Sequence, residues 1–272
     1  MKPVHHLIRL AVCVTVAALS AITLMACPQT QGIRVTQNVP YGVGYVSDSA
    51  TSENWSLKTL LLDVYDMPDS SSAAKPAVLL VHGGSFESGS KDKEEIVALA
   101  NHFTRNGYVC FSMDYRLRDD FPPAPSYWGA VALSSAAHAA IVDIKAALRF
   151  IQAQADTYGV DPNRVALVGE SAGAIAGVAA AVSEPDDYAS DGEDFPIPQD
   201  NHPDQTPRVD AYVHLWGSAD HVLLKIGRND PPTMIVHGTE DDNFFTPFGA
   251  AERFHAMLEL WGIPHEFYAA EG

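Results

Sequence analysis

The feature that most constrains this chain is a run of four apolar residues leading directly into the pattern Gly-x-Ser-x-Gly. The run covers residues 165–168, and the pattern sets Gly169 and Gly173 around Ser171. Small apolar residues at 175–182 follow and predict a helix. A strand that turns sharply into a helix at a serine forms a nucleophile elbow, which exposes the hydroxyl above the sheet edge. Glycines are needed on both sides because strand and helix pass too closely for a Cβ atom.

The pattern by itself arises by chance about once in every ten chains of this length, given a glycine frequency of about 7 %. A glycine-rich turn in an ordinary α/β protein is therefore the alternative interpretation. The strand-like run before the pattern and the helix-like run after it favour the elbow.

Strand-length apolar runs recur along the chain and alternate with segments of helical pattern. Helices are predicted at 93–106, at 246–260 and, after a cap at Ser134 or Ser135, through Ile151. The alternation predicts an α/β fold with a mostly parallel, doubly wound sheet and helices on both faces. We expect one domain over residues 41–272, without internal repeats. The predicted strands lie around 43–46 and at 57–65, 77–81, 109–113, 165–168, 209–215, 233–236 and 265–269.

Residues 1–27 have the organisation of a secretory leader. Lys2 and Arg9 form a short basic region, and sixteen uncharged residues follow from Leu10 to Met25. The segment ends in Leu-Met-Ala-Cys, which resembles the bacterial lipobox and implies a lipidated Cys27 as the mature N-terminus. An ordinary signal peptide that ends near a cysteine is the alternative. We expect residues 28–40 to be a tether between a membrane anchor and the domain.

Charge restricts the partners of this chain. It holds 34 acidic and 17 basic residues, a formal charge of −17. This balance argues against nucleic acid, or an anionic membrane surface, as a partner. Eight of the acids fall within residues 184–206, which contain four prolines and no lysine or arginine. We expect a solvated loop there; a calcium site is the alternative, although the spacing does not match an EF-hand loop.

Two further segments contain candidate catalytic groups directly after predicted strands. His82-Gly83-Gly84 follows the run at 77–81, and adjacent glycines let backbone N–H groups face a ligand without side-chain obstruction. We expect His82 itself to orient this loop. A serine nucleophile also needs a base, and the base needs a carboxylate to hold its tautomer. Asp241 and Asp242 follow the strand at 233–236 and both qualify as that acid, whereas Glu240 is less favourably placed.

Four ordered motifs resemble those of the α/β-hydrolase carboxylesterases, and most closely the branch with feruloyl- and acetyl-esterase-like domains. They are His82–Gly84, Asp114–Leu117, Gly169–Gly173 and His237–Asp241, and the resemblance covers roughly residues 40–272. It implies an α/β-hydrolase fold and hydrolysis of small-molecule or polysaccharide-linked esters, without a metal or organic cofactor. By the same resemblance Ser171 is the nucleophile, Asp241 the acid, and Gly83, Gly84 and Ala172 the oxyanion-hole donors.

The resemblance also places a catalytic histidine in the loop after the last strand. The sequence ends at Gly272, where that loop begins, so we expect a C-terminally truncated domain that lacks its base. His265 precedes the last strand and His255 falls within a helix. His214 and His221 precede the acid in the chain. A non-catalytic binding module on the same fold is the alternative hypothesis. A serine peptidase is disfavoured because no propeller or large lid is present.

Overall fold

The computed structural model describes residues 32–67, 73–128 and 132–271. The predicted leader at 1–27, with its lipidation candidate Cys27, lies outside the described residues. Residues 69–72, whose sequence predicts a turn, also lie outside the described residues.

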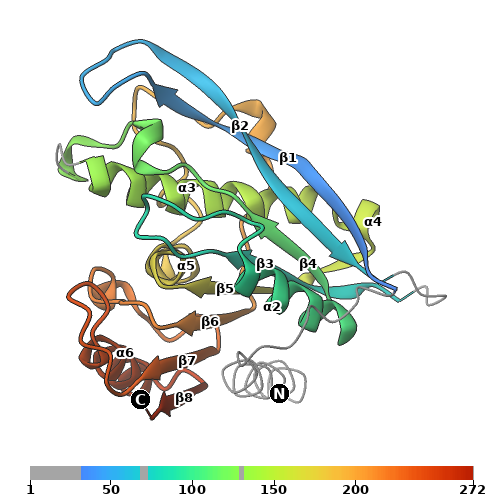
Figure 1. Ribbon diagram of the computed structural model, residues 1–272, viewed down its shortest axis with the longest axis vertical. Helices are drawn as coiled ribbons and strands as arrows, with labels where there is room; N and C mark the ends of the chain where they lie inside the picture. The colour runs from blue at the N-terminus through green and yellow to red at the C-terminus, as the bar shows by residue number, and fades with distance from the viewer. Residues whose placement is uncertain (1–31, 68–72, 129–131, 272) are drawn as a thin grey trace.

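The described chain forms one eight-stranded sheet with the order β1-β2-β4-β3-β5-β6-β7-β8 (Figure 1). The pairs β1–β2 and β2–β4 are antiparallel, and every other neighbouring pair is parallel. This is the mostly parallel α/β-hydrolase sheet that the sequence predicts. The strands are β1 (Arg34–Ser47), β2 (Trp55–Asp66), β3 (Lys75–Val81), β4 (Val109–Met113), β5 (Val160–Glu170), β6 (Ala211–Leu215), β7 (Thr233–Gly238) and β8 (His265–Ala270).

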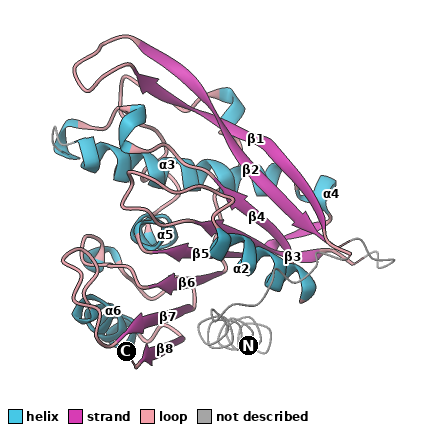
Figure 2. Ribbon diagram, in the orientation of Figure 1, coloured by secondary structure: helices cyan, strands magenta, loops and turns pink. Residues whose placement is uncertain are grey.

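Helices cover both faces of the sheet, as Figure 2 shows. Because side chains alternate along each strand, β3 sends Leu79 and Val81 into one core cluster and Val78 and Leu80 into the other. The first cluster packs against α3, α5 and α6, and the second packs against α2. The helices are α2 (Glu94–Arg105), α3 (Ala132–Ala153), α4 (Ala155–Tyr158), α5 (Ala172–Val182) and α6 (Phe248–Trp261).

Several boundaries differ from the sequence prediction, and two of these differences correct an assignment. Helix α3 begins at Ala132, so Ser134 and Ser135 lie in its first turn rather than at its cap. The predicted tether at 28–40 is also wrong in part, because residues 34–40 form the first half of β1.

Strand β1 owes its length to partners that its own sequence does not reveal. It pairs with β2 from Arg34 to Ser47, with irregular register on both sides of Val39. The amide nitrogen of Val43 donates to Asn201 Oδ1 at 2.7 Å, and Asn201 Nδ2 donates back to the Val43 carbonyl at 2.9 Å. These two hydrogen bonds hold the middle of β1 against the segment that carries Asn201.

Candidate active site

Ser171 lies at the turn between β5 and α5, in a backbone conformation that side-chain-bearing residues rarely adopt. Its φ is 51° and its ψ is −115°. A Cβ on Gly169 would lie 2.4 Å from the carbonyl oxygen of Gly173, and one on Gly173 would lie 2.4 Å from the carbonyl oxygen of Val81. Both glycines are therefore required by close packing, and the strain at Ser171 has the form found at functional sites.

The loop after β3 packs directly on this serine. A Cβ on Gly83 would lie 2.9 Å from Ser171 Cβ, so only a glycine lets the loop backbone approach. The next three residues, Gly84, Ser85 and Phe86, all have positive φ, at 123°, 57° and 61°. A run of left-handed residues bends the chain tightly, and it sets the amides of this loop beside Ser171.

Ala172 supplies a third amide at the same place. It is the first residue of α5, and the first N–H groups of a helix have no partner within the helix. The positive end of the α5 dipole adds to their attraction for a developing negative charge. Gly83 and Ala172 therefore both lie directly at Ser171, and Gly84 is the next residue of the same loop.

His82 holds this loop in shape. It is buried, its Nδ1–H donates to the carbonyl of Gly83 at 2.7 Å, and its ring stacks on Tyr115 at 4.3 Å between centroids. The Tyr115 hydroxyl donates to the His82 carbonyl at 3.0 Å. Desolvation by burial lowers the pKa of His82, which favours the neutral ring. These contacts support the loop-orienting role expected for His82.

Asp241 lies just beyond the carboxyl end of β7, where its own loop holds the carboxylate. Oδ2 is 3.1 Å from Nε2 of the buried His237, and Oδ1 accepts the amide of Asn243 at 3.0 Å. The side chain keeps 26 % of its surface exposed, so an oxygen remains open to a further donor. Its neighbours Glu240 and Asp242 are exposed to solvent.

The end of β8 lies beside this acid. Gly238 is in register with Ala270, and the amide of Thr239 donates to the Ala270 carbonyl at 2.8 Å. Asp241 follows two residues after Thr239. The chain therefore leaves β8 next to the carboxylate loop.

A pocket of about 440 Å³ opens above Ser171. That volume is within the range typical of small-molecule sites. Phe86 and Trp128 line it. Phe244 and Phe245 also line it, and they are 88 % and 63 % exposed. The sequence analysis did not identify this pair. The available signal was their position, shortly after the acidic run Glu240–Asp242.

His221, which the sequence analysis did not assign to the site, also lines the pocket. The residue is exposed at the surface. Desolvation by the surrounding protein lowers the pKa of the His221 ring, whereas the negative charge of Asp220 acts to raise it. His214 is instead buried in the core, where its Nδ1 lies 3.0 Å from the Tyr212 hydroxyl. His255 and His265 lie together at the amino end of β8, whereas Ser171 follows the carboxyl end of β5.

The acidic segment at 184–206 is not the fully solvated loop that its composition predicts. Asp191 is buried, and its carboxylate receives two hydrogen bonds from Arg116, at 2.7 and 2.9 Å. Asp187 pairs with Lys225 at 2.8 Å. The segment also supplies Asn201, the partner of β1. Part of its charge therefore ties the loop to the rest of the domain.

The comparisons with known proteins agree with one another on the family. The BD-FAE family matches residues 62–227. The chain is similar to Esterase LipC of Mycobacterium tuberculosis, with 26 % identity over 250 residues, covering 78 % of this chain and 58 % of that protein. It is similar to Esterase LipQ of the same organism, with 28 % identity over 262 residues, covering 86 % and 55 %. The chain thus spans a little over half the length of both relatives.

Solved structures agree on the fold. Thermogutta terrifontis esterase 2 phosphorylated by paraoxon matches with a TM-score of 0.64 and 21 % identity, covering 92 % of this chain and 86 % of that one. The eight-stranded sheet, the turn at Ser171 and the family match across β3, β4, β5 and β6 all agree: the chain belongs to the BD-FAE family and has the α/β-hydrolase fold.

Proposed function

We propose that this protein is a serine-dependent carboxylic ester hydrolase that acts through an acyl-enzyme. The observation that carries the proposal is the strained Ser171, at φ 51°, in a pocket with the Gly83 backbone packed against its Cβ. Membership of the BD-FAE family and the similarity to esterases support the same activity.

In the proposed reaction Ser171 Oγ attacks the ester carbonyl carbon and loses its proton to a base. The amides of Gly83, Gly84 and Ala172 stabilise the negative charge on the carbonyl oxygen. The alkoxy group leaves with a proton, and the acyl group stays on Ser171 until water releases it as the acid.

Asp241 is the proposed orienting carboxylate for a histidine base. The chain leaves β8 beside the Asp241 loop, because Thr239 is hydrogen-bonded to Ala270. A histidine in the segment after β8 would therefore meet Asp241, in the arrangement that the family resemblance implies. This geometry favours that segment over His221, which lies in the pocket but has Asp220 as its carboxylate neighbour.

The pocket supports a small-molecule or polysaccharide-linked ester as the substrate. Its aromatic lining, with Phe86, Trp128, Phe244 and Phe245, favours an apolar group beside the scissile bond. Ester hydrolysis of this kind requires a serine, a histidine base, a carboxylate and amide donors, without a metal or organic cofactor.

Nitrophenyl esters of increasing acyl length and an organophosphate probe test the proposal on the full-length protein. An organophosphate is suitable because the similar Thermogutta esterase 2 is known phosphorylated by paraoxon. We expect ester turnover and a single phosphorylated peptide containing Ser171, identified by mass spectrometry. Labelling at any other serine, or no labelling by a protein that hydrolyses esters, would contradict the proposed nucleophile.

We further infer that the protein is exported and held at the cell envelope through a lipid on Cys27. The inference depends on the uncharged stretch at 10–25 and the lipobox-like ending. Within the described part of the chain, no helix has the length and apolar character needed to span a bilayer.

Replacement of Cys27 by serine should release the protein from the membrane fraction into the soluble fraction. The reason is that serine offers no thiol for the lipid. Cell fractionation with immunodetection measures the change. Cys13→Ser is the matched control, since Cys13 lies within the uncharged stretch, and it should leave the distribution unchanged. Retention of Cys27→Ser in the membrane fraction would identify the uncharged stretch itself as the anchor.

A further inference from the structure

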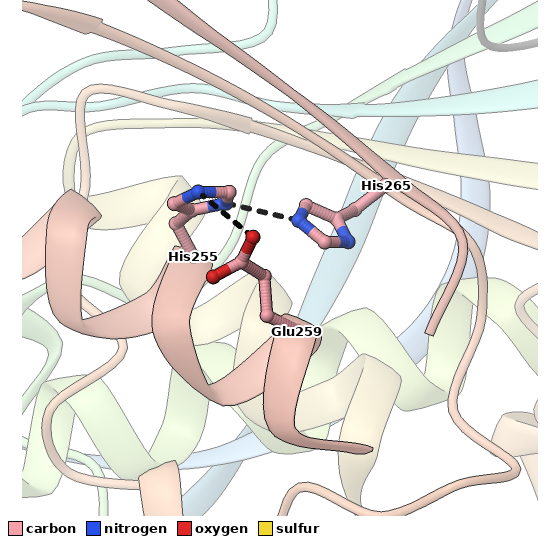
Figure 3. A group of neighbouring side chains, drawn as sticks. All are labelled: His255, Glu259 and His265. Atoms are coloured by element: carbon pink, nitrogen blue, oxygen red, sulfur yellow. Dashed lines mark hydrogen bonds and ion pairs between the residues drawn. The ribbon is translucent and has the colours of Figure 1, made fainter. Parts of the chain in front are cut away.

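Three metal-ligating side chains converge at the amino end of β8, away from the pocket (Figure 3). His255 and Glu259 come from α6, and His265 is the first residue of β8. One ligating atom from each lies within 4.8 Å of the other two. His255 Nδ1 and His265 Nε2 are 2.9 Å apart, and His255 Nε2 is 3.8 Å from Glu259 Oε1.

The local fold presets this arrangement. A spacing of four residues places His255 and Glu259 on the same face of α6. The helix ends at Gly262, whose φ of 67° reverses the chain, and the buried Ile263 anchors the turn in the core. His265 is therefore brought back over the last turns of the helix from which the other two project.

One hydrogen bond fixes the tautomer of His265. Its Nδ1–H donates to the backbone carbonyl of Ile263 at 2.8 Å. The lone pair of Nε2 is consequently directed at His255. Metal-bound histidines are oriented in the same way, by donating their other ring N–H to a carbonyl or carboxylate.

Neither neutral tautomer of His255 suits both of its neighbours. With the proton on Nδ1, the ring donates to His265, but the lone pair of Nε2 faces the Glu259 carboxylate. With the proton on Nε2, the nearest Glu259 oxygen is 3.8 Å away, too far for a hydrogen bond, and two lone pairs oppose each other at 2.9 Å. A cation placed between these residues would instead accept their electron pairs.

We propose that His255, Glu259 and His265 bind a zinc ion. Two imidazoles and a carboxylate are a donor set that Zn²⁺ accepts in tetrahedral geometry, with a solvent molecule in the fourth position. With Zn–N bonds of about 2.0–2.1 Å, two imidazole nitrogens in such a site lie about 3.3 Å apart. The histidine nitrogens need to separate by only a few tenths of an ångström. The Glu259 side chain is 64 % exposed, which leaves room for the solvent ligand.

The position of the site indicates a structural role. Strand β8 is the edge strand and pairs only with β7 within the sheet. A metal bridge from α6 to His265 would hold the start of this strand on the helix that precedes it. The site lies at the amino end of β8, whereas Ser171 follows the carboxyl end of β5, so the metal site is separate from the proposed ester hydrolysis.

Isothermal titration of EDTA-treated protein with zinc chloride tests the site without using activity. We expect one zinc per chain with a dissociation constant in the micromolar range or tighter. Glu259→Gln should weaken binding at least tenfold, and His255→Ala should abolish it. His102→Ala, which removes a partly buried histidine on α2, should bind like the original protein. Zinc should also raise the thermal midpoint of the original protein by several degrees, but not that of His255→Ala.

Cobalt gives a second readout. Co²⁺ in place of zinc should show the intense visible absorption of a tetrahedral site in the original protein and lose it in His255→Ala. If the metal-free variants remain folded by circular dichroism and bind zinc like the original protein, the ligand assignment is wrong. If the original protein binds no zinc, a proton on His255 satisfies both neighbours instead, and the proposal fails.

Discussion

Replacement of Ser171 by alanine is expected to reduce kcat for ester hydrolysis by about 10⁶-fold, as loss of the nucleophile does in other serine hydrolases. The hydroxyl is the only group removed, so the oxyanion amides and the pocket remain. Residual turnover should come from those amides and from binding alone. Stopped assays with a nitrophenyl ester, together with the organophosphate probe, measure both the lost turnover and the lost label.

Ser171→Gly separates the chemical role of this position from its backbone strain. Both variants lack the hydroxyl, but glycine tolerates a φ of 51° without a Cβ clash. Strain at such a residue costs about 1–3 kcal/mol, against an entropic cost of about 0.5–1 kcal/mol for a glycine. Ser171→Gly should therefore unfold at a higher temperature than Ser171→Ala. Activity retained by Ser171→Ala would assign the nucleophile elsewhere, and a lower midpoint for the glycine variant would contradict the strain.

The parts of the fold that were predictable from sequence are those with a local signal. The buried runs at 77–81 and 109–113 are strands of the sheet, and β5 turns into α5 at Ser171. Parallel strands covered on both faces read as continuous apolar runs, so their pattern is visible without knowledge of their partners.

The parts that sequence missed depend on contacts distant along the chain. The first half of β1 is polar, and its order comes from pairing with β2, where the Asn38 amide also donates to Asp63 Oδ1 at 2.8 Å. Phe244 and Phe245 are exposed in a polar loop, and only the fold shows that they border the pocket. The sequence does not distinguish Asp191 from the solvated acids around it, because its partner belongs to another segment.

That partner, Arg116, is fully buried and joins three segments of the chain. Its guanidinium donates to Asp143 of α3 at 2.7 Å, to Asp191 at 2.7 and 2.9 Å, and to the carbonyl of Tyr45 in β1 at 3.0 Å. Burial acts to lower the pKa of Arg116, but the two carboxylates outweigh it and raise the pKa. The guanidinium is therefore charged at every pH at which the protein is folded.

Arg116→Met should destabilise the protein by about 3–5 kcal/mol, because it leaves two buried carboxylates without a cation. For a chain of this size each kcal/mol corresponds to about 2–4 °C in the thermal midpoint, so the midpoint should fall by roughly 6–20 °C. Differential scanning calorimetry at neutral pH measures the shift. Arg253→Met is the matched control. It breaks an ion pair with Asp220 of similar length, 2.6 Å, in which both side chains are about half exposed. Exposed pairs contribute about 0–1 kcal/mol, so the control should shift the midpoint by only a few degrees.

The same substitution should also affect the pocket, since Asp191 anchors the segment that carries Tyr188. The Tyr188 ring packs against the Trp128 ring, with 6.0 Å between the ring centroids, and Trp128 lines the pocket. We expect Arg116→Met to raise KM for esters more than it lowers kcat at a temperature where the variant is folded, because the wall of the pocket loosens while Ser171 and its amides keep their places. Equal stability of the Arg116 and Arg253 variants would mean that solvent reaches the buried carboxylates, and the network would then have no part in holding the acidic segment.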